Sequence, residues 1–75
     1  FNSTTRITYG LPDADFVKIR VFDITGQTVA TLHNGIQTSG HHTAVWKAGS
    51  AAAGIYFIRL ESPHLNAIQH VTLLK

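Results

Sequence analysis

The chain has 75 residues, a formal net charge of +2 and no cysteine. A chain of this length forms one domain, and folding removes only roughly 60% of its unfolded surface from water. Without cysteine, no disulfide can crosslink the chain and no thiolate can act as a nucleophile or metal ligand. Hydrophobic residues make up 44% of the chain and charged residues 13%, which is too apolar for disorder and too interrupted for a membrane span. We therefore expect a soluble globular module stabilised by packing and strand pairing.

The charges and the first residue set two further expectations. The six cations are spread along the sequence, so there is no basic run of the kind that follows a phosphate backbone, and we expect no nucleic-acid partner. The chain begins at Phe1 and contains no methionine. We therefore expect residues 1–75 to be a single domain that was cut from a larger protein or is a processed product, and the composition leaves its compartment open.

The first predicted strand spans Thr4 to Tyr9. Its β-branched residues favour extended backbone, and Thr5, Ile7 and Tyr9 alternate with polar side chains on the other face. We expect this strand at the edge of a sheet. Residues 10–15 should end it, because Pro12 cannot donate to a ladder and the neighbouring aspartates favour turns.

The clearest period of the chain lies between Phe16 and Val29. Val17, Ile19 and Val21 fall on one face of an extended segment, with cations between them. The turn at residues 23–27 follows, where an aspartate can accept backbone hydrogen bonds and Gly26 can take a positive φ. A second apolar run, residues 29–32, completes a β-hairpin.

The second half of the chain is predicted to contain three more strands. We expect a loop over residues 34–40, a strand over residues 41–46, and a loop with one helical turn over residues 47–54. The apolar run after Gly54 predicts a strand covered on both faces. A turn at residues 62–66 then leads to a last strand over residues 67–74. Six strands and short connections predict an all-β, antiparallel β-sandwich of about six to seven strands.

No arrangement of polar residues predicts catalysis or a cofactor. His41 and His42 are adjacent on a strand and point to opposite faces, so they cannot share one metal ion. Asp13 and Asp15 supply too few oxygens for calcium. A sandwich of this size also offers little cleft for a pair of catalytic carboxylates. We therefore expect a protein that is not an enzyme and binds no metal.

The aromatic residues allow two interpretations. Trp46, Tyr9 and Tyr56 could form a flat platform for a sugar, because such rings combine an apolar face with a polar edge. Alternatively, Trp46 is a core residue, since it stands at an alternating position of a strand, and Tyr56 lies in the most apolar run of the chain.

Four ordered blocks carry a family resemblance over nearly the whole chain. They are Phe1 to Ile7, Val17 to Gln27, Gly54 to Leu60 and Val71 to Lys75. Together they resemble the C-terminal sorting domain of type IX secretion cargo, and also the immunoglobulin-like domain of the flagellar hook-capping protein. The resemblance implies a non-enzymatic immunoglobulin-like β-sandwich at the C-terminus of secreted proteins, often hydrolases, of the Bacteroidetes group.

The resemblance also implies a route and a set of partners. Such a domain passes through the periplasm, is recognised by the outer-membrane secretion translocon, and brings its cargo to the cell surface or medium, in some cases through a sortase-like surface-attachment complex. The family motif falls on Gly26, Gln27, Gly54 and Tyr56. Recognition is expected at the last strand, because an edge strand can be read through its main chain. This candidate recognition segment comprises Val71, Thr72, Leu73, Leu74 and Lys75.

Two alternatives remain open at this point. The domain could be a cell-surface attachment module of a polysaccharide-degrading enzyme, which would stay on the mature protein. It could also be a carbohydrate-binding module that uses Trp46 as its sugar contact.

Overall fold

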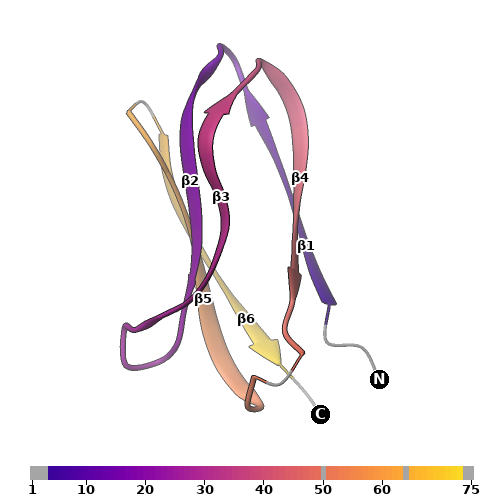
Figure 1. Ribbon diagram of the computed structural model, residues 1–75, viewed down its shortest axis with the longest axis vertical. Coiled ribbons are helices and arrows are strands. Elements are labelled where there is room, and N and C mark those ends of the chain that lie inside the picture. Colours follow the sequence, from indigo (N-terminus) through magenta and orange to yellow (C-terminus); the bar gives the residue numbers. More distant parts are fainter. Residues whose placement is uncertain (1–3, 50, 64, 74–75) are drawn as a thin grey trace.

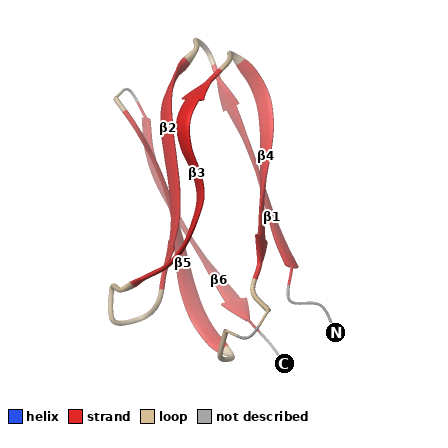
Figure 2. Ribbon diagram, viewed as in Figure 1, coloured by secondary structure: helices blue, strands red, loops and turns tan. Residues whose placement is uncertain are grey.

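The computed structural model describes residues 4–49, 51–63 and 65–73 (Figures 1 and 2). In these ranges the chain forms β1 (Thr4–Leu11), β2 (Asp15–Phe22), β3 (Thr28–Gln37), β4 (Gly40–Lys47), β5 (Gly54–Ser62) and β6 (Leu65–Leu73). The same ranges contain no helix, and hence none long and apolar enough to cross a membrane.

The strands form two antiparallel sheets. β1 pairs only with β4, and the other sheet has the order β3-β2-β5-β6. Figure 1 shows these sheets as two layers, with β1 and β4 on one side of the molecule. The prediction of a small all-β antiparallel sandwich is therefore confirmed, and so is the edge position of β1.

The core lies between the two layers. β2 contributes Val17, Ile19 and Val21, each fully buried, as the alternation of that segment predicts. β4 contributes Trp46, and β5 contributes alternate residues from Tyr56 to Leu60. The apolar faces of the two sheets therefore cover each other.

The turn between β2 and β3 has the chemistry that its sequence predicts. The Oδ1 atom of Asp23 accepts hydrogen bonds from the backbone N–H of Thr25 at 2.9 Å and of Gln27 at 3.0 Å, and from the Thr25 hydroxyl at 2.6 Å. Gly26 has a φ of 89°, in the region that a Cβ atom disfavours. These bonds fix the direction in which β3 leaves the turn.

The predicted loop over residues 34–40 is wrong for its first part. β3 continues to Gln37, with Lys18 paired to Asn34 and Val17 to Gly35. The ladder shifts register between Ile19 and Arg20, and a second shift lies near the start of β3. Neither shift falls at residues 34–37, which pair with residues 15–18 in continuous register. Pairing with β2 therefore keeps the strand where local propensity favours a loop.

Three smaller expectations also need correction. β5 is covered on its inner face only, since Ile55 on the outer face is 47% exposed. The turn after β5 is shorter than predicted, because Asn66 already pairs with Glu61. The connection from β4 to β5 contains no helix in its described residues, although the Ala51 N–H donates to the Ala48 carbonyl at 2.8 Å.

Candidate functional site

The edge strand β6 is the feature that best fits recognition by a partner. It pairs with β5 along its whole length, from Leu65 opposite Ser62 to Leu73 opposite Gly54, without a register shift. No described strand pairs with its other side. Because alternate backbone N–H and C=O groups of an edge strand point away from the sheet, β6 offers a regular row of unpaired donors and acceptors.

The composition of β6 does not protect this edge. Its sequence, LNAIQHVTL, contains no lysine, arginine, acid, proline or glycine, the residues that proteins commonly place on edges to prevent pairing. The residues from Leu65 to His70 are all exposed. The other edges are interrupted: β1 carries Arg6, β4 ends on Lys47, and β3 contains two register shifts.

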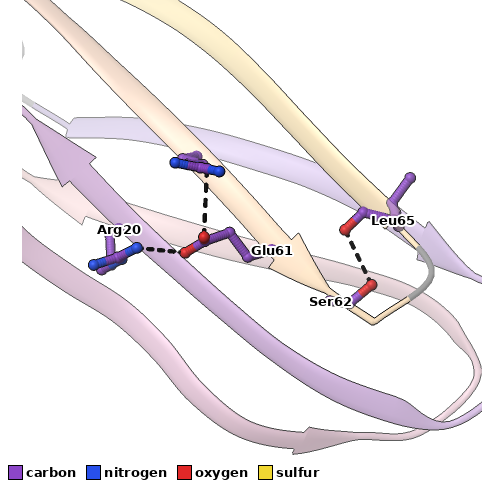
Figure 3. Close-up of polar contacts among 5 residues, drawn as sticks. Arg20, Glu61, Ser62 and Leu65 are labelled. Atoms are coloured by element: carbon purple, nitrogen blue, oxygen red, sulfur yellow. Dashed lines mark hydrogen bonds and ion pairs between the residues drawn. The ribbon is translucent and has the colours of Figure 1, made fainter.

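Polar contacts hold β6 and its neighbours in place (Figure 3). The Ser62 hydroxyl donates to the Leu65 carbonyl at 3.1 Å and closes the hairpin between β5 and β6. On the outer face, Arg20 Nη2 of β2 lies 2.5 Å from Glu61 Oε1 of β5, and Arg59 Nε lies 3.4 Å from Glu61 Oε2. The hydrogen bond from Arg20 and the nearby cations lower the pKa of Glu61 below its ordinary value. The β5–β6 hairpin is therefore tied to the centre of its sheet.

The predicted recognition segment falls partly within the described chain. Thr72 is exposed, Val71 is half-buried, and Leu73 is buried at 5% exposure. Leu74 and Lys75 lie outside the described residues. Within β6, the exposed part is therefore mainly Leu65 to His70, which the sequence-based prediction missed. The absence of charge along the strand is the signal that could have identified it.

The family-motif residues occupy structural positions. Gln27 donates to Asp23 in the hairpin turn, next to Gly26. Gly54 opens β5 with a φ of 151°, and Tyr56 is buried, with its hydroxyl donating to the Ala52 carbonyl at 2.6 Å. The β2–β3 turn, the start of β5 and the end of β6 lie at the same end of the molecule (Figure 1). Blocks far apart in sequence are therefore gathered at one end.

The predicted aromatic platform does not form. Trp46 is only 3% exposed and packs edge-on against Tyr56, with ring centroids 5.0 Å apart. Tyr9 lies away from this pair, 5.6 Å from the His42 ring, and its hydroxyl accepts a hydrogen bond from Gln37. The core interpretation of Trp46 therefore holds, because a buried ring has no free face on which a sugar can stack.

The titratable residues do not converge. Among the described residues, no group of three or more His, Asp or Glu side chains is placed to hold a metal ion. His42 is half-buried and contacts the Thr38 carbonyl through Nε2 at 2.7 Å, whereas His41 is exposed. Asp13 and Asp15 line a pocket with Pro12 and Ser62. The β1–β2 and β5–β6 connections lie at the opposite end of the molecule from the β2–β3 turn (Figure 1).

Comparison with known proteins identifies the family of the chain. The family model described as "Secretion system C-terminal sorting domain" matches residues 1–73 of the 75-residue chain. No curated protein and no solved structure matches the chain. The match spans both sheets and includes the turn and the strand entry on which the sequence resemblance depends, and the last block as far as Leu73. The chain therefore belongs to the family of type IX secretion C-terminal sorting domains.

Proposed function

We infer that this domain, a type IX secretion sorting signal by its family membership, interacts with the secretion system and directs secretion toward the cell surface or extracellular space. The family is in general non-catalytic. We propose that the domain is recognised through the free edge of β6, to which a strand of the outer-membrane translocon pairs through main-chain hydrogen bonds. The observation that carries this proposal is the uninterrupted, uncharged and exposed edge of β6.

The cargo and the route are proposed from the family resemblance. Residues 1–75 form the C-terminal domain of a larger secreted protein, a hydrolase by the family resemblance. The fused cargo waits in the periplasm until the translocon recognises the folded domain. A sortase-like complex then releases the cargo or attaches it to the cell surface. The resemblance supports these steps, and the position of β6 offers a physical means for the recognition step.

An export assay tests the proposal. Residues 1–75 are fused behind a periplasmically targeted fluorescent reporter in a type IX-competent bacterium, and the location and mass of the reporter are followed. The wild-type fusion should reach the surface or medium only when the translocon is present. Loss of roughly the mass of the domain would identify a removable sorting signal, whereas retention of that mass would favour an attachment module.

Matched variants test the role of the edge. Ile68→Lys places a charge on the outer face of β6, where Ile68 is 66% exposed, and should trap the reporter in the periplasm because charges block strand addition. Ile36→Lys makes the same change on β3, the opposite edge of the same sheet, at a residue that is 72% exposed. Equal export of the two folded variants would refute recognition through the β6 edge.

A further inference from the structure

The sandwich is open along one side, between β1 and β6. On the opposite side, residues 38 and 39 join β3 directly to β4 and bring the two sheets together. β1 and β6 are both edge strands, but they belong to different sheets and do not pair with each other. Both are drawn fainter than β3 and β4 in Figure 1, which shows them on the far side of the molecule. Partly buried residues that pack against the core, Ile7 and Tyr9 of β1, therefore meet solvent along the β1–β6 side.

An apolar groove of about 190 Å³ follows this opening. Its floor includes Ile58 and Leu60 of β5, one wall includes Ile7 and Tyr9 of β1, and the other wall includes Ala67 of β6. No acid, lysine, arginine or histidine lines it. The groove runs directly beside the free edge of β6.

The inward-facing side of β6 is incompletely covered at this groove. Leu73 is buried and Val71 packs against the core. Because side chains alternate between the two faces of a strand, Ala67 and Gln69 lie on the same face as Val71 and Leu73, yet both are exposed. Ala67 is the Cα partner of the core residue Leu60, and its small side chain leaves space above the floor. Ile58 and Leu60 below them are only 3% and 7% exposed. The uncovered apolar surface here therefore belongs mainly to the walls, to half-buried Ile7 and Tyr9 of β1 and exposed Ala67 of β6.

We propose that the groove receives alternate side chains of the partner strand that adds to β6, and that it selects uncharged, apolar residues at those positions. This inference rests on the proposed function and adds a side-chain requirement to the main-chain pairing. A strand paired to β6 continues the four-stranded sheet, so every second side chain must point toward the β1 layer, at intervals of about 6.6–6.8 Å along the strand. In the groove those side chains would pack over Ile58 and Leu60 and displace water from the half-buried side chains of Ile7 and Tyr9.

The occupant is an extended segment of a partner protein and not a second copy of this chain. If β6 of another copy added to this edge in an antiparallel register centred on its middle, the inward-facing Ala67 and Gln69 would enter the groove. An alanine fills little volume, and a glutamine places an amide against an apolar floor, where it lacks hydrogen-bond partners. Self-pairing would therefore cover the groove poorly.

The experiment fills the groove without changing the backbone of the edge. Ala67→Trp and Gln69→Trp place an indole on the groove side of β6. Asn66→Trp and His70→Trp place the same ring at exposed positions on the outer face of the same strand. All four are tested in the reporter fusion, and circular dichroism and thermal unfolding of the isolated variants confirm that each one folds. Using two variants per face keeps the comparison valid if one of them does not fold.

We expect export of the groove-side variants to fall about tenfold or more. Export of the outer-face variants should fall less than about twofold. Export at the wild-type level by folded groove-side variants would overturn the inference. If Thr72→Lys, which places a charge at an exposed position of β6 that does not line the groove, blocked export in that case, pairing with the β6 edge would stand and only the groove would be excluded. Loss of export by all four variants would also overturn it, because the effect would not be specific to the groove.

A photocrosslinking residue at position 69 provides an independent measurement in the same fusion. The inference is supported if the crosslinker at position 69 forms an adduct with a translocon component and the same crosslinker at position 36 does not. An adduct with the mass of two fusions identifies a second copy as the occupant and overturns it.

Discussion

Gly54 and Leu73 are Cα partners in the ladder between β5 and β6. The glycine that opens β5 thus lies opposite the last described residue of β6, and the two sequence blocks at residues 54 and 73 form one structural unit. Leu73 is buried, so the backbone at Gly54 helps to place the end of the edge strand in the core. The backbone conformation of Gly54 should therefore affect both the stability of the domain and the position of the β6 edge.

Gly54→Ala should destabilise the domain by about 1–3 kcal/mol, the order of cost for a side chain held in a backbone region that favours glycine. The φ of Gly54 is 151°, and an added Cβ would have no heavy atom within 4 Å, so the cost is in the backbone and not in a clash. Gly35→Ala is the matched control, because Gly35 has the same open surroundings without a positive φ. Urea unfolding of both variants measures the difference, and equal midpoints would contradict the assignment.

Asp23→Ala should lower the stability at neutral pH and weaken its dependence on acid. The hydrogen bond from the Thr25 hydroxyl, with the backbone bonds of the turn, holds the pKa of Asp23 below its ordinary value of 3.8. The unfolded chain therefore binds a proton at higher pH than the folded chain does. The stabilising contribution is complete above the ordinary pKa and is lost as the pH falls through the lowered, folded-state pKa.

Thermal unfolding between pH 7 and pH 2 checks this expectation. The difference in melting temperature between the wild type and Asp23→Ala should shrink as the pH falls. Asp13→Ala is a suitable control, since Asp13 is exposed and lies before β2, whereas the Asp23 turn follows it. A constant difference across the pH range would contradict a role for the ionised Asp23 carboxylate.

Glu61→Gln should reduce stability most at low ionic strength. Glu61 is the acid that contacts Arg20 and Arg59, and these arginines are Cα partners across β2 and β5. Removing the carboxylate charge leaves the two arginines side by side with no acid between them, and like charges opposite each other destabilise a sheet. The deficit should become smaller in 1 M salt, where the Debye length is only about 3 Å. Unfolding curves at low and high salt measure it, and a deficit that does not depend on salt would argue against a charge effect.

Trp46→Ala should destabilise the domain by about 3–5 kcal/mol, because it removes a large buried ring from a small core. Val45→Ala, on the exposed face of the same strand, is the control and should cost much less, since Val45 is 38% exposed. Trp46 is the single tryptophan of the chain, so its emission should shift to longer wavelength on unfolding. A folded Trp46→Ala variant of wild-type stability that has lost polysaccharide binding would restore the sugar-contact interpretation.

Local sequence was sufficient for the strands with a strong period and for the hairpin turn. The alternation at Val17, Ile19 and Val21 predicts their common burial, because successive side chains of a strand point to opposite faces. The pairing of Asp23 with Gly26 predicts the turn, since both act through bonds and dihedral angles within a few residues. The four ordered blocks were also sufficient to indicate the family that the comparison then identified.

Long-range pairing decided the features that local patterns could not. Asn34 and Gly35 favour a loop by themselves, but pairing with β2 holds them in β3. Trp46 could equally face solvent or the core until the second sheet covers it. The exposed edge of β6 and the groove beside β1 depend on which strands become neighbours. Because residues 7 and 67 approach this groove from opposite ends of the chain, the tertiary structure alone places them together.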